Sequence, residues 1–186
     1  GWQIYYESSL LTQTPQKLVK AFAILDDKLE QIEALVPSPA TKKLRQVPIW
    51  LSVDQGTGLV YHASRSWLVR HGRNPAMSHG VELQNVDDFI LWIESQPMVL
   101  LHELAHSLHH RVFDYQQASI SAAFKHAKEQ NLYGSVKRYD GGLVKAYALE
   151  DEREYFAELS EAYFGRNDYY PFNKQELQRY DPIGYA

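Results

Sequence analysis

His102-Glu103-Leu104-Ala105-His106 is the stretch that decides the fold, because it places two histidines four residues apart inside a run that reads as a helix. Residues four apart on a helix project from the same face, with Cβ atoms about 5–6 Å apart. Two imidazoles at that spacing can bind one metal ion, typically Zn²⁺. With 8 histidines in 186 residues, chance gives roughly 0.02 occurrences of the pattern, so composition explains it poorly.

Glu103 is the residue of this pattern that could act as a catalytic base. It follows the first histidine and can reach a metal-bound water, from which it takes a proton as general base. The alternative is a solvent-exposed helix whose histidines are incidental. An apolar stripe that would bury the helix argues against that alternative; it consists of Leu101, Leu104, Ala105 and Leu108.

Composition limits the classes of protein that the chain can belong to. A chain of 186 residues with 45% hydrophobic and 23% charged residues fits a single globular domain, 1–186. The net charge of −4 and the lack of a basic cluster argue against a nucleic-acid partner. No apolar run approaches the roughly 18 residues of a membrane span. The absence of cysteine excludes disulfides and thiol catalysis.

The start of the chain does not resemble a signal peptide, and it lacks an initiator methionine. Both features are consistent with a trimmed form from which a targeting or pro-segment has been removed.

Periodicity predicts an α+β fold that is mainly helical. Before the metal-binding helix we expect, in chain order, a helix, two strands, a short helix, a strand and a helix: 15–36, 47–53, 59–62, 66–71, 80–84 and 86–94. After it we expect a helix, a β-hairpin of two strands and two more helices: 120–131, 135–139, 143–149, 151–164 and 173–179. The βαβ alternation of a doubly wound sheet is missing.

A third metal ligand is expected downstream, because a catalytic zinc usually has three protein ligands. In the acidic segment 150–161, Glu154, Glu158 and Glu161 share one helix face. Inward carboxylates are costly without a cation nearby, so we prefer Glu154 as the ligand, with Glu158 supporting the ligands from behind. The alternative is a solvated acidic face. Glu161 and Asp114 could orient the imidazoles through N–H bonds, but the sequence does not assign either.

His109 lies seven residues after His102, near the same helix face. Contact with substrate or with an ordered water is one interpretation. A packing or surface role is the interpretation that we prefer.

The HExxH segment and the stretch from Tyr147 to Glu158 together resemble the anthrax-lethal-factor-like metallopeptidases. These belong to the gluzincin branch of zincins and include the Pro-Pro endopeptidases. The family places a tyrosine seven residues before a glutamate ligand. The resemblance implies one catalytic Zn²⁺ held by His102, His106 and Glu154, with Glu103 as base. It also implies that Tyr147 stabilises the oxyanion and that Glu158 supports the site.

Tyr147 also makes chemical sense without the family. A phenol at the end of a hairpin strand can donate a hydrogen bond to a developing oxyanion. The alternative, a packed hairpin tyrosine, would be favoured for a lone tyrosine, and only the spacing to Glu154 argues against it.

The resemblance is specific for residues 98–165 and only architectural upstream. Family members carry a small sheet whose edge strand pairs with an extended peptide substrate. By position and alternation, the expected edge strand is 80–84, which begins at Gly80 and ends at Gln84. Secretion or export is a further implication of the resemblance. The chain lacks the large toxin's additional domains, which argues against a toxin-like substrate.

The expected function is therefore that of a zinc-dependent endopeptidase that uses a metal-activated water, with Glu103 as general base. One alternative is a catalytically silent, metal-stabilised module that binds peptides or proteins on a peptidase fold. The intact Glu103 argues against it, because a pure binder needs no base beside the metal. An aminopeptidase would need a carboxylate for the free amine, and no motif specifies one.

Overall fold

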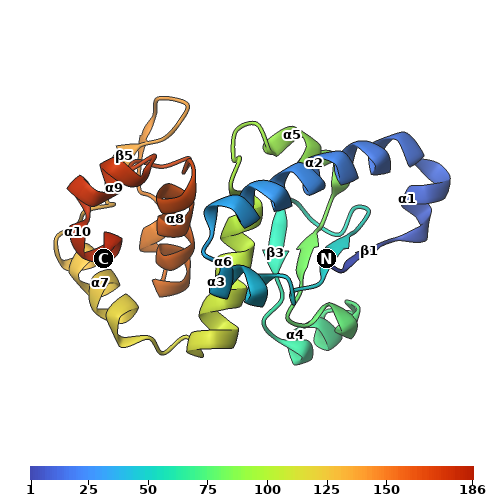
Figure 1. Cartoon of the computed structure of the whole chain (residues 1–186), viewed down its shortest axis with the longest axis horizontal. Coiled ribbons are helices and arrows are strands. Elements are labelled where there is room, and N and C mark those ends of the chain that lie inside the picture. Colours follow the sequence, from blue (N-terminus) through green and yellow to red (C-terminus); the bar gives the residue numbers. More distant parts are fainter. The chain divides into compact units, whose positions relative to one another are not determined.

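The computed structural model describes residues 1–186, which form two compact units, Gly1–Glu94 and Ser95–Ala186. The predicted α+β class is confirmed, because helices dominate beside a four-stranded sheet in the first unit and a two-stranded hairpin in the second (Figure 1). None of the helices is both long and apolar enough to span a bilayer.

The sheet of the first unit has the strand order β1-β2-β4-β3. β1 (Ile4–Tyr6) pairs in parallel with β2 (Ile49–Leu51), β2 pairs in parallel with β4 (Val81–Leu83), and β3 (Leu59–Tyr61) pairs antiparallel with β4. The prediction that residues 80–84 form a peptide-accepting edge strand is therefore wrong. β4 is bonded to a strand on each side, and alternation along one strand cannot reveal which neighbours it will have.

The helices of the first unit partly follow the predicted pattern. The unit contains α1 (Ser8–Gln13), α2 (Pro15–Leu35), α3 (Ser38–Leu44), α4 (Arg65–Arg70), the 3₁₀ turn η1 (Pro75–Met77) and α5 (Val86–Trp92). α2 packs against α5. The Asn85 side chain caps α5 by accepting from the Asp87 and Asp88 amides. The Thr14 side chain makes no cap bond to α2, and its hydroxyl donates to the Leu10 carbonyl of α1.

A buried polar network surrounds Glu82 in the middle of β4. Its carboxylate accepts from Ser52 Oγ at 2.5 Å and lies 2.7 Å from His62 Nε2, and Arg73 forms an ion pair with it. Burial alone would raise the pKa of Glu82. The bonds from His62 and Ser52 and the charge of Arg73 outweigh burial and leave that pKa below its usual value.

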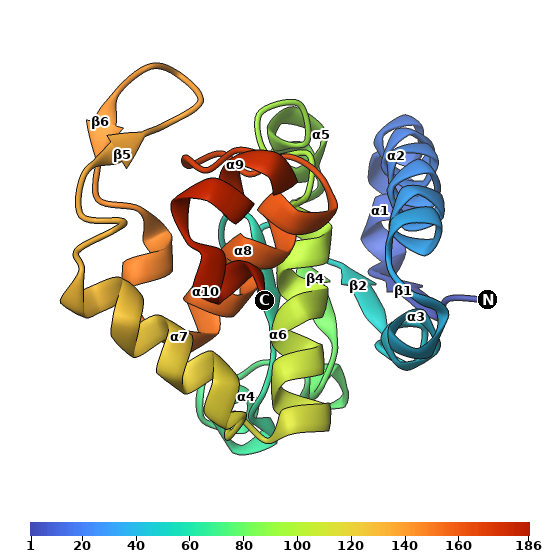
Figure 2. The same cartoon turned by 60° about the vertical axis from the view of Figure 1, so that its left-hand side comes forward.

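The second unit is built around α8 (Glu152–Phe164), which packs against α6 (Val99–Phe113), α7 (Ala118–Glu129), the 3₁₀ turn η2 (Tyr147–Leu149) and α9 (Lys174–Tyr180). The chain ends in α10 (Pro182–Tyr185). Within this unit the hairpin of β5 (Val136–Lys137) and β6 (Leu143–Val144) extends away from α8 and α9 (Figure 2). The predicted strand 143–149 stops at residue 144, so Tyr147 lies in η2 rather than on the hairpin.

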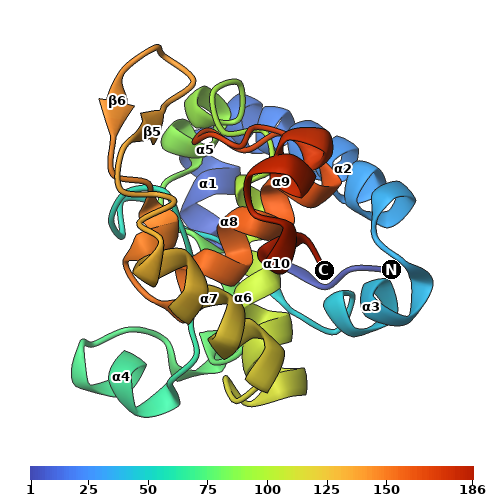
Figure 3. The same ribbon diagram turned by 90° about the vertical axis from the view of Figure 1, so that its left-hand side faces the viewer.

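Asp181, which follows the last residue of α9, links the C-terminal segment of the chain to α8 by hydrogen bonds. Asp181 Oδ2 accepts from the Tyr155 hydroxyl at 2.5 Å and from the Tyr133 hydroxyl at 3.1 Å, and Oδ1 accepts from the Gly184 amide at 2.9 Å. Both phenols and the carboxylate are buried. The C-terminal helix α10 packs against α9 and α7 (Figure 3).

Candidate metal centre

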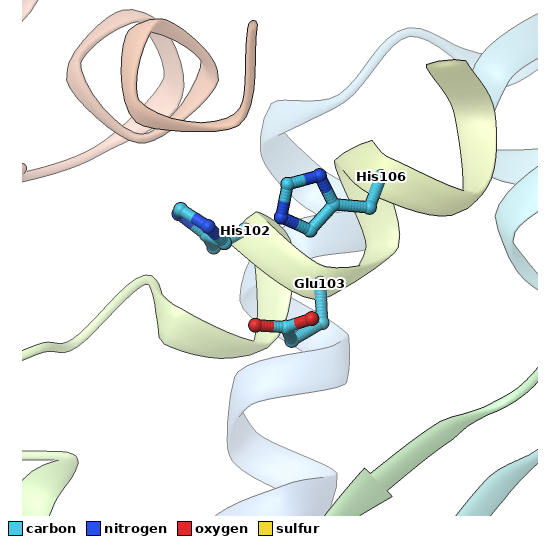
Figure 4. A group of neighbouring side chains, drawn as sticks. All are labelled: His102, Glu103 and His106. Atoms are coloured by element: carbon cyan, nitrogen blue, oxygen red, sulfur yellow. The ribbon is translucent and has the colours of Figure 1, made fainter. Parts of the chain in front are cut away.

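α6 carries the HExxH residues, and all three polar side chains are buried. The helix begins after Met98, whose carbonyl accepts from the His102 amide at 2.9 Å, so the motif falls within the first two turns. Figure 4 shows the imidazoles of His102 and His106 projecting from successive turns, with the Glu103 carboxylate beside them. The ring centroids lie 4.7 Å apart, and the rings are nearly perpendicular at 83°. The expected placement of the two rings on one face is confirmed.

α8 brings Glu154 to these two rings. The Asp151 side chain caps α8 by accepting from the Arg153 and Glu154 amides, which places Glu154 in the first helical turn. Its Oε2 atom lies 3.0 Å from His102 Nε2 and 3.2 Å from His106 Nε2. Three potential ligand atoms therefore converge from two helices.

The two separations from Glu154 Oε2 are close to those between ligand atoms that share a tetrahedral metal ion. Two donors bound to Zn²⁺ at about 2.0–2.1 Å, at a tetrahedral angle, lie about 3.3 Å apart. The observed separations from Glu154 are within a few tenths of an ångström of that value. Potential ligand atoms of His102, Glu103 and His106 also lie within 4.8 Å of one another. These residues could hold a metal ion.

The other ring nitrogen of His102 is held from behind by Glu161. Nδ1 lies 2.7 Å from Glu161 Oε1, an arrangement that fixes the ring and leaves Nε2 facing Glu154. Glu158, to which the sequence assigned the supporting role, accepts from Asn167 Nδ2 at 3.0 Å. It belongs to a second buried cluster with His102 and Glu161 that could also hold a metal ion. Asp114, the other candidate for orienting an imidazole, is an exposed residue that caps the C-terminal end of α6.

The sequence favoured Glu158 for the supporting role, but the carboxylate that contacts His102 Nδ1 is that of Glu161. Both lie on the same face of α8, and only the packing of α8 on α6 decides which carboxylate reaches the imidazole.

The electrostatics of the cluster favour positive charge. Burial lowers the pKa of His102, but the hydrogen bonds that its ring donates to Glu154 and Glu161 outweigh burial and hold that pKa well above its ordinary value. Burial raises the pKa of Glu154, but its bonds to the two histidines bring it far below the usual range. Burial raises the pKa of Glu158 and of Glu161, and repulsion from Glu161 raises the former further. So many buried carboxylates are costly unless a cation lies nearby, and these residues could hold a metal ion.

Tyr147 lies beside the histidines, as the spacing to Glu154 suggested. Its ring centroid is 6.4 Å from that of His102, and the two ring planes differ by 25°. The residue is 47% exposed, so the phenol sits at the rim of the cluster.

His109 is a fully buried packing residue, in line with the preferred interpretation. Its ring contacts those of Tyr115 and Phe156, with centroids 5.1 Å and 5.0 Å away. Neither ring nitrogen has a hydrogen-bond partner. Burial, together with the charges of His106 and Arg153, lowers the pKa of His109 to about 4, so the ring is neutral at ordinary pH.

Comparisons of the chain with family models, curated proteins and solved structures found no match. The resemblance to lethal-factor-like metallopeptidases therefore rests on the motif residues alone.

Proposed function

We propose that the protein is a zinc-dependent endopeptidase. The observation that carries the proposal is the approach of Glu154 Oε2 to within 3.0 Å and 3.2 Å of the Nε2 atoms of the two HExxH histidines. Two imidazoles and one carboxylate form the usual protein ligand set of a catalytic zinc, with a position left for substrate or water.

Each residue of the cluster has a distinct task. His102, His106 and Glu154 hold the cation, and Glu161 orients the His102 ring. When bound, Zn²⁺ would polarise a substrate carbonyl and acidify water. Glu103 takes the proton of the attacking water and passes it to the leaving amine. Tyr147, half-exposed beside His102, donates a hydrogen bond to the carbonyl oxygen as negative charge develops there.

The decisive variant is Glu103→Gln, which preserves the shape of the side chain and removes the base. Incubation of the zinc-loaded chain with a diverse peptide library should give cleavage that a zinc chelator abolishes. The variant should lower kcat/KM by about 100- to 10,000-fold, the contribution expected of a general base. Its zinc content, measured by atomic emission, should not change.

A matched control is Glu150→Gln, which alters an exposed carboxylate paired with Lys145 only four residues before Glu154. It should leave both activity and zinc content intact. Full activity in Glu103→Gln would overturn the mechanism. Tight peptide binding without cleavage by the wild-type chain would instead favour the silent binding module.

A further inference from the structure

His109 is a fully buried histidine whose two ring nitrogens have no hydrogen-bond partner. Its ring contacts those of Tyr115 and Phe156, so packing accounts for the ring but not for its nitrogens. An apolar side chain could pack in the same place without the cost of burying unpaired polar atoms. A buried polar group without a partner calls for a physical explanation, and a bound ion is one that chemistry offers an imidazole.

A carboxylate lies close to one of these nitrogens. Glu152 Oε1 is 3.9 Å from His109 Nε2, which is too far for a hydrogen bond. The same oxygen accepts a hydrogen bond of 2.8 Å from Ser121 Oγ. His109 lies in the last part of α6, Ser121 in α7 and Glu152 at the start of α8, and α8 packs on both other helices. An imidazole nitrogen, a carboxylate and a hydroxyl therefore form one cluster at the junction of three helices.

The separation between His109 and Glu152 suits a cation held between them better than a direct bond. Two donors that share a tetrahedral Zn²⁺ ion lie about 3.3 Å apart, so the carboxylate would have to move by only about half an ångström. The Glu152 side chain is 27% exposed and has room for that movement, and a cation could reach the buried nitrogen from this exposed side. The adjoining Arg153 is paired with Asp151 and not with Glu152.

We propose that His109 Nε2 and Glu152 bind a Zn²⁺ ion of their own, at a site separate from the proposed catalytic centre. Imidazole nitrogen and carboxylate oxygen are ligands that Zn²⁺ accepts, whereas Mg²⁺ and Ca²⁺ prefer oxygen alone. Because the protein supplies only two strong ligands, water or the Ser121 hydroxyl completes the coordination, and the affinity is lower than at a site with three. The inference concerns binding, so it holds whether or not the chain hydrolyses peptides.

The test is a calorimetric titration of the metal-free chain with zinc chloride, which should reveal a weak class of site beside a tight one. Glu152→Gln removes the charged ligand but keeps an acceptor for Ser121. It should weaken the weak class at least about tenfold, since the loss of a residue behind a ligand already costs that much. His109→Phe keeps an aromatic ring at this position and should abolish the weak class. The control is Glu129→Gln, an exposed carboxylate of α7.

The two variants act at one proposed ion, so they should give the same result. A weak class that persists in both Glu152→Gln and His109→Phe would mean that the ion binds elsewhere, and the inference would be overturned. Equal weakening of the tight and the weak class would overturn it as well, because Glu152 would then act on the catalytic centre. Because Glu152 is partly exposed, its variant keeps the test decisive if His109→Phe fails to fold. His106→Ala should remove the tight class and leave the weak one.

Discussion

The two ring nitrogens of His102 face different carboxylates. Nε2 faces Glu154 and the metal position, while Nδ1 faces Glu161 at 2.7 Å. A carboxylate on the far nitrogen of a ligand histidine fixes the tautomer and raises the basicity of the coordinating nitrogen. Glu161 should therefore influence metal affinity without touching the metal.

Replacing Glu161 by Gln removes the negative charge behind His102 but keeps a similar shape. Zinc affinity should fall by about 10- to 100-fold, the usual cost of losing such a partner. Competition with a fluorescent chelator measures the change. Glu158→Gln is the matched control, since Glu158 accepts from Asn167, and it should have a clearly smaller effect. Equal losses in the two variants would show that Glu161 has no special role.

The spacing of residues along α6 was enough to predict that the rings of His102 and His106 share one face, whereas Glu154 was chosen from the acidic face of a second helix and from the family resemblance. Four residues separate His102 from His106, and the structure places both rings and Glu154 together. Glu161 could not be selected over Glu158, because that choice depends on how two helices pack.

At the scale of elements, the long helices were predicted well, and so were the short helices α4, α5 and α9, whereas β1, α1 and α3 were not predicted. α2 and α8 each span several turns and show a clear amphipathic or acidic face. β1, α1 and α3 contain 3, 6 and 7 residues, too few to establish a period. The position of β4 inside the sheet depends on pairing with distant strands, which a local pattern cannot show.

The buried carboxylate of Glu82, in β4, should make the free energy of unfolding of the first unit sensitive to acid. The pKa of Glu82 is lower in the folded state than its unfolded value of about 4.3. The unfolded state therefore binds more protons in the window below that value. The stabilisation from Glu82 is fully present above it and is lost as the pH falls through the lower folded pKa.

The measurement is the free energy of unfolding in urea between about pH 6 and about pH 3, for the wild type and Glu82→Gln. Tryptophan fluorescence is a suitable signal, because all 4 tryptophans lie in the first unit. The wild type should lose stability toward the acid end, and the variant should show a flatter dependence. Parallel curves would exclude Glu82 as the source of the acid sensitivity.

The loop between β2 and β3 depends on Gly58. Its φ is +78°, and a Cβ atom there would lie 2.7 Å from the Trp92 ring. Gly58→Ala should therefore destabilise the first unit by about 2–4 kcal/mol, from backbone strain plus a clash. Gly72 has a φ of +67° but no neighbouring atom within 4 Å, so Gly72→Ala should cost only about 1–2 kcal/mol. Urea unfolding followed by tryptophan fluorescence compares the two; equal losses would rule out the Trp92 contact.

At the scale of the whole molecule, the proposed ligands all belong to one unit. His102, His106 and Glu154 lie within Ser95–Ala186. A ligand that binds only the native state suppresses the opening of the segments that hold it. Zinc should therefore slow amide hydrogen exchange in α6 and α8 much more than in the strands β1–β4. Exchange followed by mass spectrometry, with and without zinc, resolves these segments. Equal slowing in the sheet and in the two helices would contradict this expectation.

The hydrogen bond between Tyr155 and Asp181 also affects when α8 becomes firmly packed during synthesis of the chain. Every proposed ligand precedes residue 181 in the chain, yet the hydroxyl of Tyr155, next to Glu154, has its acceptor only there. Until residue 181 is available, a buried phenol on α8 lacks its partner, and the helix is held less firmly. The packing of α8, and with it the fixed position of Glu154, is therefore completed only by one of the last segments to be synthesised.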